Sequence, residues 1–142
     1  MKKYFNIPLM IMMLAGVLAV SAQAQTNSSQ RVIASIPFAF NVGKTTLPAG
    51  KYTIIVLNPT SDRKTLQIRS LNGRASAIVL TTTSSGRASD NAKLVFERYG
   101  DQYLFAEAQM EETTLAALRT KERSDKYVAK AGKKSIVVIA AE

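Results

Sequence analysis

Two dipeptides that are typical of tight turns constrain the fold of this chain more than any other feature. Each lies between two runs in which apolar and polar residues alternate. Asn72-Gly73 separates one such pair of runs, and Gly100-Asp101 divides the stretch KLVFERYGDQY at residues 93–103 in the same way. A period of two is that of a β-strand with one buried face, and Asn-Gly or Gly-Asp between two strands is typical of a two-residue hairpin turn. The sequence therefore predicts two β-hairpins.

The first predicted hairpin turns at Asn72-Gly73. A type I′ turn needs positive φ at both central residues, which Asn and Gly accept best. A two-residue loop also fixes the strand register, and it pairs Ile68 with Ala77 while the other positions follow in step.

The second predicted hairpin turns at Gly100-Asp101, with glycine in the first central position, as a type II′ turn requires. The expected pairs are Phe96 with Phe105, Arg98 with Tyr103 and Leu94 with Glu107. Arg98, Asp101 and Tyr103 could instead form a catalytic or ligand-binding trio. We favour the turn, because the register gives Asp101 a structural position and places Arg98 against the Tyr103 ring.

The remaining segments predict a mostly β fold. Alternation over residues 32–42 indicates a strand, and Pro37 makes it an edge strand or one with a bulge. Acidic residues before and basic residues within residues 113–131 favour a helix that stops at Gly132, and residues 135–140 form a last strand. We expect an antiparallel β-sandwich or partly open barrel of about seven or eight strands with one C-terminal helix.

The N-terminal residues have the form of a secretory signal peptide. Two lysines precede an apolar run that ends in Ser-Ala-Gln-Ala, and the run is shorter than the roughly 20 residues that cross a bilayer. We expect a signal peptide at residues 1–24 that is cleaved after Ala24. A flexible spacer at residues 25–30 and a single domain at residues 31–142 should follow, in the periplasm or outside the cell.

The absence of histidine and cysteine from all 142 residues excludes several classes of function. It removes the usual neutral-pH general base, the Ser-His and Cys-His nucleophile pairs, disulfides, and nearly all zinc, copper and haem sites. No pair of carboxylates has a spacing that indicates glycoside hydrolysis, and no spaced oxygen ligands indicate a calcium loop. We expect no catalytic residue, no metal and no cofactor.

Positive charge is concentrated near the C-terminus. The chain has a formal net charge of +9; without the signal peptide this becomes +7, of which +5 lies in residues 119–134. Such a field favours an anionic envelope polymer or membrane surface, and an exported protein is not expected to meet nucleic acid. The alternative is a solvated helix face. The candidate ligand-binding residues are Arg119, Arg123, Lys126, Lys130, Lys133 and Lys134.

Four sequence blocks resemble a family of small exported bacterial proteins of uncharacterised function, found chiefly in acidobacteria. They are IPFAFNVG at residues 36–43, LPAGKYTI at 47–54, IRSLNGRA at 68–75 and KLVFERYGDQY at 93–103. The resemblance covers roughly residues 31–107 and implies a β-rich fold. The apolar C-terminal run and the lack of tryptophan depart from the family pattern. The resemblance implies no activity, so it assigns no catalytic residues.

Three classes of function follow in order of preference. The first is a structural or interaction protein of the cell envelope without catalytic activity, which an exposed apolar edge would favour. The second is a binding module for an anionic envelope ligand, which a continuous basic stripe would favour. The third is a histidine-free hydrolase, which would need carboxylates that converge in a deep groove.

Overall fold

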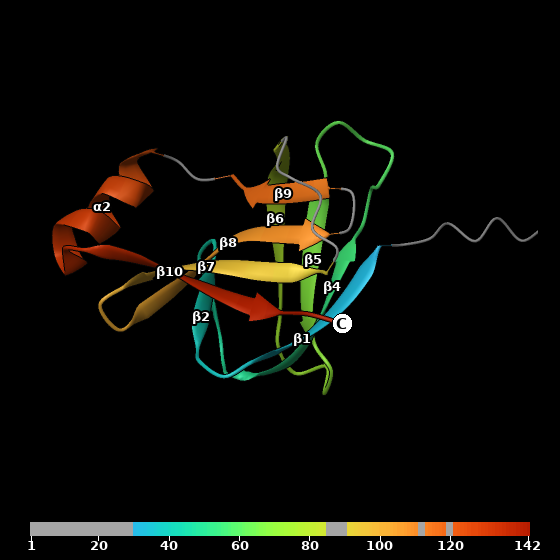
Figure 1. The fold of residues 1–142 in the computed structure, drawn as a ribbon, viewed down its shortest axis with the longest axis horizontal. Coiled ribbons are helices and arrows are strands. Elements are labelled where there is room, and N and C mark those ends of the chain that lie inside the picture. The colour runs from blue at the N-terminus through green and yellow to red at the C-terminus, as the bar shows by residue number, and fades with distance from the viewer. Residues whose placement is uncertain (1–29, 85–90, 111–112, 119–120) are drawn as a thin grey trace, which may run out of the picture.

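The computed structural model describes residues 30–84, 91–110, 113–118 and 121–142 (Figure 1). The predicted signal peptide, its cleavage position and all but the last residue of the predicted spacer lie outside these residues. The described chain forms β1 (Arg31–Ile36), β2 (Phe40–Val42), β3 (Thr45–Leu47), β4 (Gly50–Val56), β5 (Thr65–Ser70), β6 (Ser76–Ser84), β7 (Lys93–Tyr99), β8 (Gln102–Met110), β9 (Thr113–Ala117), α2 (Lys121–Ala131) and β10 (Lys134–Ala140).

The strands form two layers that share strand β6. One layer has the order β1-β4-β5-β6, and the other runs β6-β9-β8-β7-β10, with the short pair β2-β3 beside β8. Strand β6 belongs to both because its residues 76–80 pair with β5 and its residues 81–84 pair with β9. In Figure 1, β7, β8, β9 and β10 run across β4, β5 and β6. A long strand that changes sheets in this way makes a corner of a sandwich-like fold.

The prediction of a mostly β fold with one short C-terminal helix is confirmed. The described strands number ten rather than seven or eight, because short segments around β2 and β3 also pair. The sheet is mixed rather than wholly antiparallel, since β2 meets β8 in parallel at Asn41 and Leu104. The sheet does not close into a barrel. Strands β1 and β10 come close to one another without pairing, and just beyond β10 Ile33 and Glu142 exchange two backbone hydrogen bonds of 2.8 and 2.9 Å.

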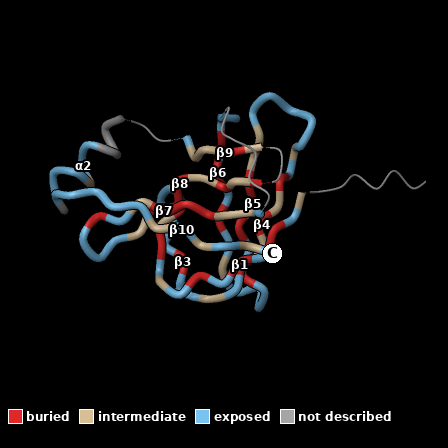
Figure 2. Tube along the Cα trace, in the orientation of Figure 1, coloured by how far each residue is buried: buried red, intermediate tan, exposed pale blue. Residues whose placement is uncertain are grey.

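One hydrophobic core lies between the two layers. Alternate residues of β1 and β4 point into it, including Ile36, Tyr52 and Ile54, each at most 1% exposed. Phe96 of β7 is fully buried and makes edge-to-face contacts with the rings of Phe38, Phe40 and Phe105 at centroid distances of 5.2, 5.3 and 5.9 Å. Figure 2 shows buried positions concentrated between the layers, whereas α2 and β10 are largely exposed.

The first hairpin has the predicted register but not the predicted turn. Ile68 pairs with Ala77 as expected. The positive φ is found only at Gly73, at 72°, and no described residue other than glycine has positive φ, so a type I′ turn is excluded. The loop is wider, because Ser70 pairs with Ala75 through a 2.8 Å backbone bond. The Asn72 side chain stabilises it instead, since its Oδ1 accepts hydrogen bonds from the Ser70 hydroxyl at 2.6 Å and the Arg74 N–H at 3.0 Å.

The second hairpin confirms the predicted two-residue loop. Tyr99 pairs with Gln102 across Gly100 and Asp101, and the φ of 60° at Gly100 fits the first central position of a type II′ turn.

The pairs Phe96 with Phe105 and Arg98 with Tyr103 are present as predicted. The pair of Leu94 with Glu107 is wrong, because a β-bulge inserts Ala106 and shifts the register by one residue. Leu94 then lies opposite Ala108, and both are buried. Without the bulge, the Glu107 carboxylate would face the core beside Leu94, where an unpaired charge is costly.

The predicted helix at residues 113–131 is wrong in its first part. Thr113–Ala117 is strand β9, which pairs with β8 on one side and β6 on the other. Leu115 is fully buried there. The local sequence suits a helix, but backbone pairing on both sides and burial of one face favour the strand. Helix α2 begins only at Lys121 and ends before Gly132, whose N–H bonds to the Val128 carbonyl at 3.0 Å.

The predicted strand over residues 32–42 is broken at Pro37. Strand β1 ends at Ile36 and β2 begins at Phe40, so the chain leaves one layer and joins the other between them. Proline cannot donate to a strand ladder, which explains why the break falls there. The edge position is confirmed, since β1 stands at one end of the strand order.

Candidate functional site

Helix α2 and the start of β10 carry the predicted basic residues that the structure describes. Lys126 and Lys130 are exposed one helical turn apart, and with Gln102 and Tyr127 they line a hollow of about 240 Å³ beside the β7–β8 turn. Lys133 is exposed in the connection that follows. We call this hollow the basic hollow. None of the described side chains that line it is a carboxylate.

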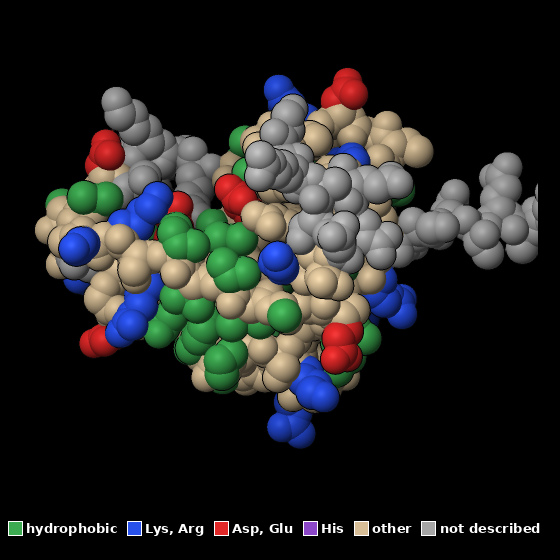
Figure 3. Space-filling view, viewed as in Figure 1, with side chains coloured by type: hydrophobic (Ala, Val, Ile, Leu, Met, Phe, Trp, Pro, Cys, Tyr) green, Lys and Arg blue, Asp and Glu red, His purple; other side chains and the backbone are tan. Residues whose placement is uncertain are grey.

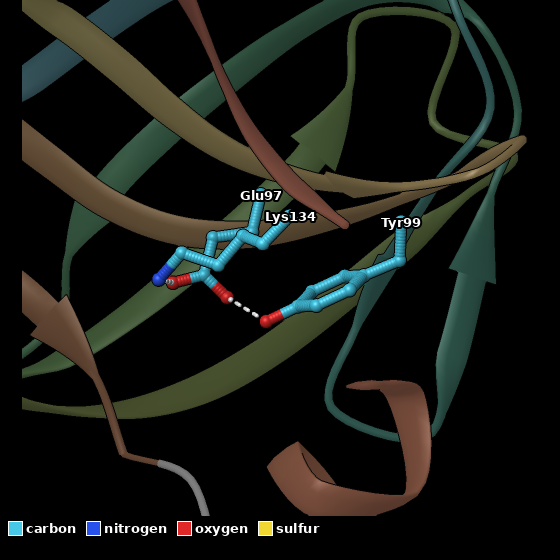
Figure 4. A network of polar contacts seen from close by, with 3 residues as sticks. All are labelled: Glu97, Tyr99 and Lys134. Atoms are coloured by element: carbon cyan, nitrogen blue, oxygen red, sulfur yellow. Dashed lines mark hydrogen bonds and ion pairs between the residues drawn. The ribbon is translucent and has the colours of Figure 1, made fainter. Parts of the chain in front are cut away.

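Lys134 differs from these lysines because it has an ionic partner. Its Nζ lies 3.1 Å from Oε1 of Glu97, and the Tyr99 hydroxyl donates to Oε2 of the same carboxylate at 3.0 Å (Figure 4). The Glu97 side chain is only 16% exposed, whereas that of Lys134 is 49% exposed. Lys134 therefore neutralises a largely buried carboxylate, and its position is explained by the fold.

The same group of residues also holds the helix in place. Tyr127 of α2 stacks on Tyr99 of β7 with a centroid distance of 6.0 Å and an interplanar angle of 30°. Tyr99 is itself buried. Among the described side chains, this ring contact joins the helix to the sheet beside the basic hollow, while Val128 on the same helix remains exposed.

The structure brings together only part of the predicted basic set. Lys126 and Lys130 both line the basic hollow, and Lys133 is not among its lining residues. Lys134 forms an ion pair with Glu97. Arg119 lies outside the described residues, and so does the side chain of Arg123 within α2. The described lysines do not by themselves make a continuous stripe, because Lys134 is engaged with a carboxylate. Figure 3 shows Lys and Arg side chains over α2 at one end of the molecule, with others scattered elsewhere.

The residues Arg98, Asp101 and Tyr103 do not form a trio. The Arg98 Nε donates to the Gly100 carbonyl at 2.8 Å, and its guanidinium carbon lies 5.5 Å from the centre of the Tyr103 ring. Phe38 stacks on Tyr103 at 3.8 Å. Asp101 is exposed at the turn. Arg98 and Tyr103 therefore brace the hairpin as predicted.

Two further hollows were not anticipated from the sequence. One of about 350 Å³ lies between the turns before β4 and after β5, and it includes Tyr52, Asn72 and the basic residues Lys51 and Arg74. Its walls come from segments about 20 residues apart, so only the β4–β5 pairing could reveal it.

The other unanticipated hollow, of about 220 Å³, lies where Gln30 and Arg31 meet Glu142. The Gln30 Oε1 there is buried and accepts no hydrogen bond from the part of the chain that the structure describes. The described residues contain no group of three or more Asp or Glu side chains able to hold a metal ion.

The most distinctive exposed surface is apolar and lies on β10. Val137 and Ile139 pack against the core, while Ile136 and Val138 point outward and are 54% and 52% exposed. Figure 3 shows hydrophobic side chains gathered around this strand. The strand was predicted, but the outward direction of two β-branched residues was not, because all residues from 136 to 139 are equally apolar.

A second apolar surface lies on the outer side of the other layer. The Leu57 N–H donates to the Thr65 carbonyl, Thr65 pairs with Leu80, and the Leu118 N–H donates to the Leu80 carbonyl. All three leucines are about half exposed or more. Ile78 lies two residues from Leu80 on the same strand and is 62% exposed. Solvent-facing positions of a sheet are usually polar, so these exposed leucines and Ile78 form a second candidate interaction surface.

Comparison with known proteins finds no match: no family model fits the sequence, and no curated protein or solved structure is similar to the chain. The resemblance to small exported bacterial proteins therefore stays a prediction. The fold and its surfaces define a sandwich-like β protein with an apolar edge strand. Within the described residues, no helix combines the length and the apolar character needed to cross a membrane.

Proposed function

We propose that this protein is an exported structural or interaction protein of the cell envelope without catalytic activity. The observation that carries the proposal is the apolar edge strand β10, on which Ile136 and Val138 are half exposed. Full burial of a β-branched side chain is favourable by about 1.5–3 kcal/mol, and a half-exposed side chain lacks much of this free energy. A partner that covers Ile136 and Val138 would gain the remaining free energy of burial.

The polar groups of the molecule are consistent with this proposal. Glu97 is engaged by Lys134 and Tyr99, and Asp101 occupies an exposed turn. A hydrolase would need two carboxylates facing one cleft. Among the described residues that line the three hollows, the one acidic residue is Glu142, in the hollow beside Gln30.

Site-specific photo-crosslinking tests the proposal. A photoreactive phenylalanine analogue at position 138 should capture a discrete partner in intact cells, whereas the same group at Thr46, an exposed position on β3, should not. Equal labelling at both positions, or none at 138, would contradict an interaction surface on β10. The compartment is tested by intact-mass analysis, which should find a chain that begins at Gln25. Retention of Met1 would exclude cleavage.

A second function, binding of an anionic envelope polymer or lipid surface, is favoured by the basic hollow. Its lysines face solvent without an acidic residue in the lining. Attraction to a polyanion should weaken with salt, because the Debye length falls from about 10 Å at 0.1 M to about 3 Å at 1 M.

The test of this second function replaces Lys126, Lys130 and Lys133 by Gln and leaves Lys134 in place to protect the Glu97 contact. The matched control replaces the exposed residues Lys44, Lys51 and Arg63 by Gln, which removes the same charge. Binding to anionic vesicles and acidic polysaccharide should fall only in the first variant. Equal losses in both variants would mean that net charge alone is responsible, and no binding by the native protein would remove this function.

A further inference from the structure

Strand β10 has one side of its backbone without a strand partner. It pairs with β7 through residues 134–140, and no other strand of the described chain pairs with it. Figure 1 shows β10 at the front of its layer, with its final residues approaching β1. The end of β10 lies close to β1, and within the described chain the backbone bonds that join the two segments are those between Ile33 and Glu142.

The direction of each backbone group on β10 follows from two hydrogen bonds beyond its end. The Ala141 N–H donates to the Ala92 carbonyl on the β7 side at 2.9 Å, and the Glu142 N–H donates to Ile33 on the opposite side at 2.9 Å. The register with β7 is uninterrupted from residue 134 to 140. Successive residues of a strand direct their N–H and C=O groups to opposite sides. Odd-numbered residues of β10 therefore bond to β7, and even-numbered residues face away from it.

Three apolar even-numbered residues lie along the open edge of β10 after Lys134, namely Ile136, Val138 and Ala140. Their N–H and C=O groups have no backbone partner within the described chain. All three residues are exposed. Donors and acceptors that repeat every second residue are complementary to one kind of ligand, an extended polypeptide.

We propose that the edge of β10 accepts an extended segment of a partner protein as an added strand. This inference rests on the proposed function and specifies its surface and partner. The side chains of Ile136 and Val138 call for apolar residues at alternate positions of the segment. The exposed Lys133 at the start of the strand, with Lys130 at the end of α2 just before it, calls for acidic residues at the end of the segment that lies beside them.

A second copy of this chain is a poorer occupant than an acidic segment. Each copy carries the same formal charge of +7 once the predicted signal peptide is removed, so approach of two copies is opposed at low ionic strength. Lysine next to an exposed edge is also a common device against edge-to-edge pairing of identical sheets. The same lysines attract a segment of opposite charge.

Peptide binding measured by fluorescence anisotropy tests the proposal. The probe is a labelled peptide of alternating Val and Thr with two Glu at one end, and its control has two Lys in their place. The native protein should bind the acidic peptide at least about tenfold more tightly at low salt, and the difference should shrink at 1 M salt. A second control peptide has the acidic sequence with methyl groups on alternate backbone nitrogens. This peptide should not bind, because the methyl groups remove the backbone N–H donors that pair with β10.

Two variants at position 138 distinguish the contribution of the backbone N–H to binding from that of the side chain. Val138→Pro removes an outward N–H while leaving the bonds to β7, and proline is tolerated at such edge positions. Val138→Thr keeps the N–H. Val138→Pro should weaken binding at least about tenfold, whereas Val138→Thr should stay within a few fold of the native protein. Thermal melting verifies that both variants fold, and if Val138→Pro does not fold, the methylated peptide decides.

Three results would overturn strand addition: no binding of the acidic peptide at millimolar concentration, equal binding of the methylated peptide, or equal binding by a folded Val138→Pro variant. If sedimentation shows that the native protein is a dimer and that Val138→Pro is a monomer, the strand added to β10 belongs to a second copy of this chain and not to an acidic partner. The proposed function fails separately, through the absence of crosslinks at position 138 in cells. Crosslinks at position 138 without peptide binding would support the proposed function as an interaction protein and would contradict the addition of a strand to β10.

Discussion

The loop between β5 and β6 allows a sharp prediction, because valine at each of its two turn residues should destabilise the fold for a different physical reason. Gly73 has a φ of 72°, a conformation that costs an L-residue about 1–2 kcal/mol and a β-branched residue more. A Cβ at this position would lie 3.6 Å from Nη2 of Arg69, an ordinary van der Waals distance. Gly73→Val should therefore destabilise the fold by about 2 kcal/mol, through backbone strain and without a steric clash.

Asn72 provides the contrast. Its φ is not positive, so a β-branched side chain meets no strain there, and Asn72→Val should cost the same as Asn72→Ala. Both lose the bonds that Oδ1 accepts from the Ser70 hydroxyl and the Arg74 N–H. Because Ser70 is buried, we expect this loss to cost about 1–2 kcal/mol.

Urea denaturation at 25 °C measures the free energy of unfolding of all three variants, and calorimetry should show melting temperatures lower by roughly 4 °C per kcal/mol. Refutation would come from Asn72→Val being less stable than Asn72→Ala by more than about 1 kcal/mol, since that is the mark of a type I′ turn with positive φ at Asn72. An unchanged stability of Gly73→Val would refute the left-handed conformation at Gly73.

Three further predictions concern the core and the second hairpin. Phe96→Ala should lower the free energy of unfolding by about 3–5 kcal/mol, because Phe96 is fully buried among other rings; a loss below 1 kcal/mol in urea denaturation would contradict this packing. Gly100→Val should lower the melting temperature strongly, since Gly100 has a φ of 60°, whereas Asp101→Asn should change stability by less than about 0.5 kcal/mol; the reverse order would restore a special role for Asp101. Tyr52→Phe should cost about 1 kcal/mol at neutral pH, because the Tyr52 hydroxyl donates to the Pro48 carbonyl at 2.6 Å. Burial raises the pKa of Tyr52, so its contribution is fully present below the unfolded pKa of about 10 and is lost above it; an advantage over Tyr52→Phe that does not shrink between pH 8 and 11 would contradict a neutral buried phenol.

Local signals in the sequence predicted most of the longer strands and much of their pairing. The alternation around Gly100-Asp101 set the turn and the pairs next to it, because a two-residue loop leaves the flanking strands little freedom. The register beyond Asn72-Gly73 also held, although the turn itself was wrong. A two-residue loop and the wider loop share the same midpoint, so the same residues lie opposite one another in either case.

The tertiary structure decided what depends on neighbours distant in the sequence. Strand β9 has a helix-forming sequence, and it becomes a strand because β6 and β8 offer hydrogen bonds on both sides. The bulge at Ala106 arises because the core accepts Leu94 and excludes the Glu107 carboxylate. Neither effect has a signal within a short window of sequence.

The candidate site shows the same division. Composition predicted a basic segment near the C-terminus, since charge can be counted without coordinates. Which lysines remain free for a ligand was decided by β10 pairing with β7, which places Lys134 beside Glu97, 37 residues away. The open edge of β10 is likewise a property of the whole sheet. The sequence alone predicts a strand from its apolar residues, but only the positions of the other strands determine which side of its backbone has no strand partner, because pairing is a relation between segments that the chain brings together in folding.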